Sequence, residues 1–234
     1  MPDAAPTSAV LGVDACRGGW VGIRLDPTGA RSRVLGFFAP TVRALVEAAG
    51  PVDVVAIDIP LGLSDDTDRA PDVLAKKLAG PRRSSVFLTP PRSALLARSR
   101  READVISRRL TGKGVSSQAF ALAVKLLEAN QWAPQFPGRV VEAHPEVCFS
   151  TVAGGFLPSK RTWEGAEQRR RLLDGEGIRV PGDLGEAGLR AGVDDVLDAA
   201  VAAWTASRVL AGTAVPHPDP PVRYSDGWPC AIWA

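Results

Sequence analysis

The stretch AVLGVDACRGGWVGIRL, residues 9–25, contains two apolar runs separated by Cys16, Arg17 and two glycines. Glycine accepts the positive φ of a tight turn, so the runs 9–15 and 20–25 are predicted to pair as a β-hairpin. A third apolar run, RVLGFFA at 33–39, is predicted to form another strand. These residues therefore predict an antiparallel sheet of three strands at the start of the fold.

The residues after these strands predict a helix that crosses over to a buried strand. TVRALVEAAG, residues 41–50, spaces its apolar side chains by three and four, with Thr41 placed to cap the helix and Gly50 to end it. VDVVAIDIPLGL, residues 52–63, is rich in Val and Ile, as parallel strands buried on both faces are, and its apolar character breaks at Asp58. This order of elements predicts an α/β fold.

The remainder of the sequence predicts mostly helices. Helical patterns fill about 64–137, including SRREADVISRRLTGKG and SSQAFALAVKLLEANQWA, with a basic loop at 80–92. We expect a last core strand at about 138–144, a loop-rich segment at 150–192 and a periodic helix at 194–212 that buries Trp204. GWPCAIWA predicts a final edge strand. With no internal repeat and no flexible linker, the sequence predicts a single domain over 1–234 with a mainly helical insertion at about 64–137.

Composition narrows the classes of partner. The 28 Lys and Arg nearly balance the 26 Asp and Glu, so a net charge of +2 gives no global attraction to nucleic acid or membrane. No apolar stretch approaches the roughly 20 residues that cross a bilayer, and the first residues lack a signal-peptide pattern. The spacing of Cys16, Cys148 and Cys230 argues against a disulfide framework and a zinc site. We expect a cytoplasmic protein without a membrane partner, and the oligomeric state stays open.

Acidic residues recur at the predicted strand ends and at the start of the last helix. Asp14 ends the first strand, Asp58 interrupts the buried strand, and Glu142 lies on the last core strand. Sites in open α/β sheets form where strand ends meet helix starts, so four segments are predicted to bring carboxylates together. An all-oxygen cluster suits Mg²⁺ or Mn²⁺ better than zinc. The candidate ligands of one or two such ions are Asp14, Asp58, Glu142 and the three acids that open the last helix, Asp194, Asp195 and Asp198.

The stretch VEAHPEVCFS, residues 140–149, extends this prediction. If the stretch is extended, Glu142, His144 and Glu146 share one face, with Glu142 as a ligand and the other two around it. Structural roles stay open for each residue. Asp14 could cap the hairpin, Asp58 could bond backbone amides after its strand, Asp194 could cap its helix, and a carboxylate or carbonyl could orient His144.

Five motifs in order resemble one known family: GVDACRGGWVGI, AIDIPLGL, RRSSVFLTPPR, EAHPEVCFS and DDVLDAAVAAWTA. They are similar to the domain-of-unknown-function family numbered 429, usually described as predicted ribonuclease H-like nucleases. The resemblance covers residues 10–233. It implies a ribonuclease H-like α/β fold with a five-stranded mixed sheet, whose first three strands are antiparallel, and with helices on both faces.

The resemblance also implies roles for individual residues. Asp14 and Asp58 correspond to the first-strand and fourth-strand acids of the ribonuclease H superfamily. DVLDAA is similar to the final-helix pattern of Holliday-junction resolvases, which makes Asp195 and Asp198 the candidates for the last ligands. The family often has a dense Arg-x-x-Asp stretch after the fourth strand. Here Pro71 separates Arg69 from Asp72, which leaves the role of Asp72 open.

The basic loop predicts a phosphate-binding region beside the acids. Guanidinium groups bind phosphate oxygens through paired hydrogen bonds, and serine hydroxyls add further ones. The alternative is a surface loop whose arginines pair with the domain's own acids. Several of these positions match family motifs. The predicted substrate-binding residues are Arg83, Ser84, Ser85, Arg92, Gln118, His144 and Lys160.

These features support a main functional hypothesis and two alternatives. The main one is divalent-metal-dependent hydrolysis of phosphodiesters, as in a nuclease, by Asp14, Asp58, Glu142, Asp195 and Asp198. Its partner would be nucleic acid or a small phosphorylated substrate, and the low net charge and scattered tryptophans favour a short one. The alternatives are a non-catalytic ligand- or nucleic-acid-binding module and another phosphoryl-transfer enzyme of the same fold. That last class needs two related halves, and the chain has room for one.

Overall fold

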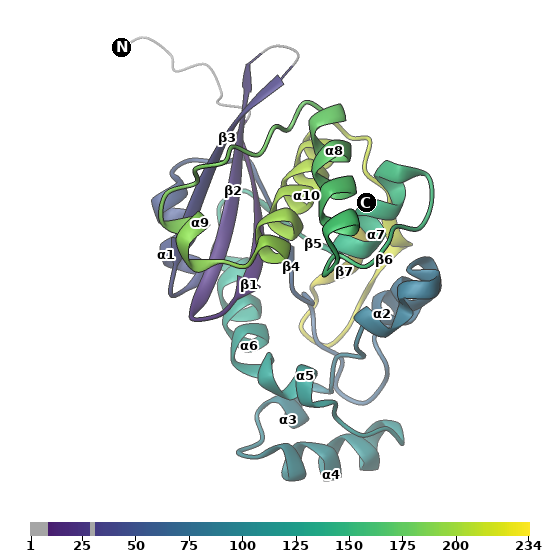
Figure 1. Cartoon of the computed structure of the whole chain (residues 1–234). Helices are drawn as coiled ribbons and strands as arrows, with labels where there is room; N and C mark the ends of the chain where they lie inside the picture. Colours follow the sequence, from purple (N-terminus) through teal and green to yellow (C-terminus); the bar gives the residue numbers. More distant parts are fainter. Residues whose placement is uncertain (1–8, 29–30) are drawn as a thin grey trace.

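A computed structural model describes residues 9–28 and 31–234 (Figure 1). The described residues form an α/β arrangement in which helices flank one mixed sheet. The sheet has seven strands, not the five that the family resemblance implies. In sheet order they are β3 (Arg31–Ala39), β2 (Gly19–Thr28), β1 (Val10–Cys16), β4 (Val54–Asp58), β5 (Arg139–Ala143), β7 (Pro229–Trp233) and β6 (Pro216–Arg223).

The first part of this sheet has the predicted pairing. β1, β2 and β3 are antiparallel, and β4 and β5 run parallel to β1. The two further strands come from the last residues of the sequence. The GWPCAIWA motif supplies β7, which lies inside the sheet between β5 and β6 and not at its edge. β6 takes the edge, where its prolines, which lack an N–H, are tolerated.

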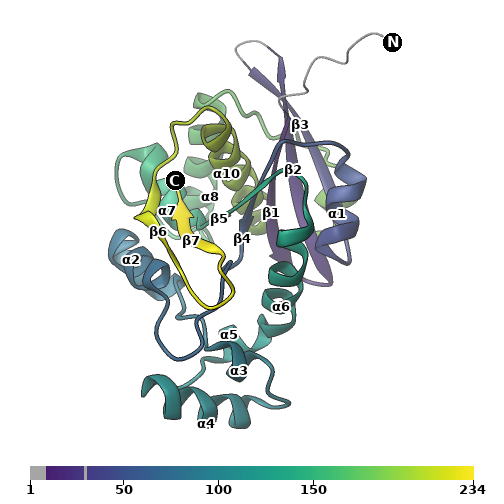
Figure 2. The same cartoon turned by 180° about the vertical axis from the view of Figure 1, so that it is seen from behind.

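Helices α1 (Val42–Ala49) and α6 (Ala123–Trp132) cover one face of the sheet (Figure 2). The hydroxyl of Thr41 accepts a hydrogen bond from the N–H of Ala44 at 3.2 Å, and Gly50 ends α1 with a φ of 77°, as predicted. Leu45 and Leu126 pack in one apolar cluster with residues of β1 and β4. This face is a dry core.

Helix α10 (Val193–Leu210) covers the other face (Figure 1). Most of its residues are buried, including Trp204, as predicted. A Cβ placed on Gly12 of β1 would lie 2.0 Å from the carbonyl oxygen of Ala199 and 2.1 Å from the backbone nitrogen of Ala203. The backbones of β1 and α10 are therefore in direct contact, which only glycine on the strand permits.

The segment at 150–192 is not the loop-rich connection that the sequence suggests. Three helices, α7 (Pro145–Ala153), α8 (Trp163–Gly175) and α9 (Glu186–Arg190), lie within or next to it. They lie on the same face of the sheet as α10 (Figure 1). Thr162 caps α8 by accepting a hydrogen bond from the N–H of Gly165 at 3.1 Å.

The interval between β4 and β5 is largely helical, as predicted. It contains α2 (Ala70–Leu78), the 3₁₀ helix η1 (Gly80–Ser85), α3 (Arg92–Leu95), α4 (Arg100–Thr111), α5 (Ser117–Ala121), α6 and the 3₁₀ helix η2 (Ala133–Gln135). Helices α3, α4 and α5 gather beyond one end of the sheet (Figures 1 and 2). The three cysteines are buried and free. Among the described residues, no helix has the length and apolarity needed to span a membrane.

Candidate metal centre and cleft

Two carboxylates lie side by side at the ends of neighbouring parallel strands. Asp14 of β1 and Asp58 of β4 are partners in the register. Val10, Val54 and Ala56 occupy alternate positions on these strands and pack in the core with α10. Because side chains alternate along a strand, Asp14 and Asp58 face α10 as well.

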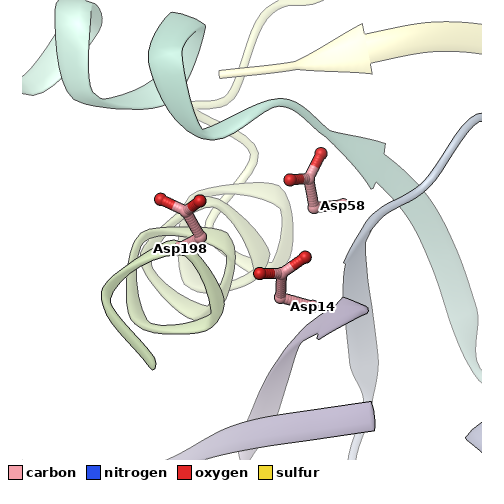
Figure 3. Close-up of side chains that lie close together, drawn as sticks. All are labelled: Asp14, Asp58 and Asp198. Carbon is pink, nitrogen blue, oxygen red and sulfur yellow. The ribbon is translucent and has the colours of Figure 1, made fainter. Parts of the chain in front are cut away.

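Helix α10 supplies a third carboxylate to this pair. Asp198 lies on the helix face that contacts β1, and its side chain points toward those of Asp14 and Asp58 (Figure 3). One carboxylate oxygen of each residue lies within 4.8 Å of the other two. Asp14 is 6% exposed and Asp198 only 1% exposed. Residues 14, 58 and 198 thus form an acidic triad from three separate elements, in which Asp14 and Asp198 are buried and Asp58 is half-buried.

The acidic triad has few hydrogen-bond partners. The Oδ1 atom of Asp14 accepts a bond from the N–H of Ala15 at 2.6 Å. Lys160, from the connection between α7 and α8, donates to Oδ2 of Asp198, and its Nζ lies 3.9 Å from Oδ2 of Asp194. The other oxygen of Asp198, Oδ1, is buried and has no hydrogen-bond partner in the described part of the chain.

The three acids make one another harder to ionise. Burial raises the pKa of Asp14 well above its usual value, and the charges of Asp58 and Asp198 raise it further. Burial and the charge of Asp198 raise the pKa of Asp58 in the same way. For Asp198, burial raises the pKa to about 6 although Lys160 lowers it. A cation between the three groups would remove this cost of bringing like charges together.

A cleft of about 660 Å³ opens over the acidic triad. The ends of β1, β4 and β5 form its floor, and residues of η1, α5 and the connection before α8 form its walls. Of the predicted substrate-binding residues, the structure places five in the lining: Ser84, Ser85, Gln118, His144 and Lys160.

A family model described as "Protein of unknown function (DUF429)" matches residues 12–223 of this chain. The chain belongs to this family. The match includes the acidic triad, Lys160 and every other residue that lines the cleft apart from Ile232. A search of curated proteins found no match to the chain.

In this DUF429 chain Glu142, predicted as a ligand, lines the cleft but is not part of the acidic triad. It pairs with Ile57 in the β4–β5 register, so it faces the opposite side of the sheet from Asp58. Its Oε2 accepts hydrogen bonds from Arg69 at 2.6 Å and from the N–H of Leu61 at 2.9 Å. Arg69 also donates to Asp72 at 2.5 Å, which gives Asp72 a structural role.

The one-face arrangement predicted for Glu142, His144 and Glu146 is wrong. β5 ends at Ala143 and Pro145 begins α7, so the extended stretch stops before Glu146. Glu146 accepts a hydrogen bond from the buried Arg169 at 3.0 Å. His144 precedes α7, burial lowers its pKa to about 4, and its Nδ1 is buried without a hydrogen-bond partner among the described residues. His144 is therefore a neutral imidazole at pH 7.

Asp195 lines the cleft but is not part of the acidic triad, and the two predicted arginines lie outside the cleft lining. Oδ2 of Asp195 accepts a hydrogen bond from the N–H of Gly192 at 3.0 Å, which caps α10, and its charge contributes to the raised pKa of Asp14. Arg83 is exposed and does not line the cleft. Arg92 donates to Asp226 at 2.8 Å, the internal pairing considered as the alternative for this loop.

Two basic residues outside the set predicted to bind substrate also line the cleft: Arg82, which belongs to the predicted basic loop, and Arg161, which the sequence did not indicate. Arg82 donates to the carbonyl of Leu157 at 3.1 and 3.2 Å, which ties η1 to the connection before α8. The basic run at 80–92 predicts positively charged side chains along one wall of the cleft. Which arginine faces the cleft depends on the turn of η1, which the sequence alone does not give. Arg161 had no signal beyond its position next to Lys160.

Proposed function

We propose that this DUF429 protein is a divalent-metal-dependent phosphodiesterase that acts as a nuclease on short substrates. The observation that carries the proposal is the acidic triad, because three clustered carboxylates from β1, β4 and α10, two of them buried and one half-buried, have no other evident use. Paired acids in a core are costly unless a cation neutralises them.

The proposal includes a ribonuclease H-like fold. Its support is the sheet order β3-β2-β1-β4-β5, in which β1 to β3 are antiparallel and β4 and β5 are parallel to β1. This is the sheet that the family resemblance implies. In this interpretation β7 and β6 extend the sheet beyond the common core.

The acidic triad suits Mg²⁺ or Mn²⁺. All its ligand atoms are oxygens, the donors that these hard cations prefer. Oxygens on opposite sides of a Mg²⁺ ion lie about 4.2 Å apart, since each bond is about 2.1 Å. The observed spacing, within 4.8 Å, therefore needs only small side-chain rotations to close on an ion. The unpartnered Oδ1 of Asp198 supplies a ready ligand atom.

A bound divalent ion would activate a water for attack on phosphorus and stabilise the leaving oxygen. The chain's own residues would do the rest. Asp14, Asp58 and Asp198 would hold the ion, and the hydroxyl of Ser84 in η1 would donate a hydrogen bond to a phosphate oxygen. The hydroxyl of Ser85 donates to the carbonyl of Arg82 at 2.8 Å, which holds the turn of η1. The neutral His144 is suited to accept a proton or a hydrogen bond at the cleft floor.

The size of the cleft favours a short substrate. A volume of about 660 Å³ lies inside the range of about 300–1,000 Å³ that small-ligand pockets occupy. A net charge of +2 gives little attraction to a long polyanion. Short oligonucleotides or a small phosphodiester are therefore the expected substrates.

The decisive experiment compares hydrolysis of short DNA, short RNA and a generic phosphodiester by the wild type and by Asp14→Asn. We expect Mg²⁺- or Mn²⁺-dependent cleavage by the wild type and a loss of about 10²-fold or more in Asp14→Asn, because one ion ligand is gone. Asp66→Asn, the same substitution at an exposed acid outside the cleft, serves as the matched control and should retain wild-type activity.

Equal cleavage rates in the wild type and in Asp14→Asn, with identical purification, would show a contaminating nuclease and remove the proposed mechanism. One observation favours the alternative of a non-catalytic binding module: Lys160 already neutralises part of the acidic triad. A module of that kind should gain no thermal stability from millimolar Mg²⁺ or Mn²⁺ beyond the effect of ionic strength, whereas ligand binding to the folded state raises stability.

A further inference from the structure

We propose that Lys160 takes the place of a second cation, so that the acidic triad binds one divalent ion and not two. This inference rests on the proposed function, since it concerns how many ions the same acids hold. It gives Lys160 a role as a positioning residue in addition to any contact with substrate.

The carboxylate oxygens of the acidic triad are already partly engaged. Oδ2 of Asp198 accepts a hydrogen bond from Lys160, and Oδ1 of Asp14 accepts one from the N–H of Ala15. The atoms left are Oδ2 of Asp14, Oδ1 of Asp198 and both oxygens of Asp58. These atoms are enough for the protein side of one coordination shell, with waters and substrate supplying the remainder.

A second ion that shared the Asp198 carboxylate would need the position that the Lys160 ammonium group holds. In two-metal sites the ions lie about 3.5–4 Å apart and share a carboxylate between them. If one ion binds Oδ1 of Asp198, a second ion sharing that carboxylate would approach Oδ2, where Nζ of Lys160 already lies. Nζ also lies 3.9 Å from Asp194, so the ammonium group faces acids on two sides.

Three further acids that line the cleft already have partners. Glu142 forms an ion pair with Arg69 at 2.6 Å. Oδ2 of Asp195 accepts the N–H of Gly192 at the start of α10. Glu146 pairs with Arg169 at 3.0 Å. These partners reduce the ligands open to a second ion, and Lys160 occupies the place beside Oδ2 of Asp198.

Charge balance supports the same conclusion. When all three are ionised, the carboxylates of the acidic triad carry three negative charges, which the ammonium group of Lys160 and one divalent ion would neutralise. A second divalent ion would leave an excess of positive charge in a largely buried site, which is unfavourable unless further anions accompany it. The Lys160 side chain is 28% exposed, so the ammonium group remains open to the cleft. There it can donate to a phosphate oxygen, as a second metal would coordinate one.

The test counts bound Mn²⁺ per chain by electron paramagnetic resonance in an equilibrium titration. We expect one ion in the wild type and two in Lys160→Met, which removes the ammonium group and keeps the aliphatic length. Lys160→Arg retains the positive charge and should bind one ion. Arg161→Met removes an exposed neighbouring cation of the same cleft and should also bind one.

The outcomes separate this inference from the proposed function. Two ions in the wild type, or one ion in a folded Lys160→Met, would overturn the inference and leave the metal-dependent function standing. No ion in the wild type, or the same binding in Asp14→Asn as in the wild type, would overturn the proposed function and the inference with it. Circular dichroism spectra establish that each variant is folded, and the wild-type count tests the inference without any variant.

Discussion

The buried charge of Arg69 holds together several groups at the carboxyl ends of β4 and β5, next to the cleft. The residue is fully buried, and its guanidinium group donates to Glu142, Asp72 and the carbonyls of Leu61 and Gly62. Two carboxylates from β5 and α2 are thereby held against the connection that follows β4. The sequence places Arg69 and Asp72 close together, but it does not give the register that turns Glu142 toward them.

At the residue scale, we expect Arg69→Met to destabilise the fold strongly. The substitution leaves Glu142 and Asp72 buried without a counter-ion, and breaking a buried ion pair in this way costs about 3–5 kcal/mol. The measurement is the free energy of unfolding in urea. Removing one of the stranded charges in the double variant Arg69→Met/Glu142→Gln should recover part of the loss.

Arg108→Met provides the matched control for this prediction. Arg108 forms an ion pair with Asp104 at 2.7 Å on the surface of α4, where its side chain is 62% exposed. Exposed pairs contribute roughly 0–1 kcal/mol, so this variant should unfold almost like the wild type. Equal losses in the two variants would mean that the buried pairs around Arg69 have no special weight.

The helices differ in how far local chemistry predicts them. Thr41 and Gly50 bound α1, and Ser99 and Gly112 bound α4, because caps and left-handed glycines are encoded in a few adjacent residues. Pro145 occupies the first position of α7, where proline favours the start of a helix. The strand-like alternation of the residues before it hides this helix start in the sequence. β6 has none, since four prolines in eight residues predict a loop unless a neighbour such as β7 offers an edge.

The contact between β1 and α10 gives a prediction at the scale of these elements. In Gly12→Ala the added Cβ would meet backbone atoms of α10 at 2.0 and 2.1 Å, so the strand and the helix would have to move apart. Overpacking of a core costs typically about 1–3 kcal/mol, and contacts with backbone should place this variant at or above the upper limit. Because α10 must shift away from β1, Asp198 should also move away from Asp14 and Mn²⁺ binding should weaken.

Gly182→Ala is the control for this substitution, because a Cβ there meets no atom within 4 Å. It should leave both the urea midpoint and Mn²⁺ affinity unchanged. If Gly12→Ala were as stable as the wild type and bound Mn²⁺ equally well, the close packing of α10 on β1 would not be what positions Asp198.

At the scale of the whole molecule, the predicted order and direction of the strands were the main basis for placing Asp14 and Asp58 in one site. Asp14 and Asp58 could be placed together from sequence because parallel neighbouring strands end at one edge of a sheet. Asp198 follows from the last helix packing on these strands. Lys160 was predicted to contact substrate, yet its bond to Asp198 joins residues 38 positions apart through a connection without regular structure. Local patterns hold no information on such a contact, nor on the β4–β5 register that excludes Glu142.

The clustering of three carboxylates in the acidic triad should make the free energy of unfolding depend on pH. Asp14, Asp58 and Asp198 have pKa values raised by burial and by one another, to about 6 for Asp198. The folded protein therefore binds protons at these groups more tightly than the unfolded chain, and their contribution to stability is lost as the pH rises from about 4 through 6 and beyond. Below pH 6.5 the lowered pKa of His144 acts in the opposite direction, so the wild-type curve alone does not isolate the acids.

Comparison with Asp14→Asn isolates them, because His144 is present in both proteins. Without divalent ions the two should be similarly stable near pH 4, where Asp14 is largely protonated, and the variant should become the more stable one toward pH 8. We expect a difference of about 1 kcal/mol or more at pH 8, since each unit of pKa displacement corresponds to about 1.4 kcal/mol. Urea unfolding at several pH values measures this difference.

Saturating Mn²⁺ should reverse the order of stability at pH 8, because the ion stabilises the complete acidic triad and binds the variant poorly. The prediction is wrong if the difference in unfolding free energy between the two proteins does not change with pH, or if Mn²⁺ leaves their order of stability unchanged. Either result would mean that the three carboxylates do not repel one another in the folded protein.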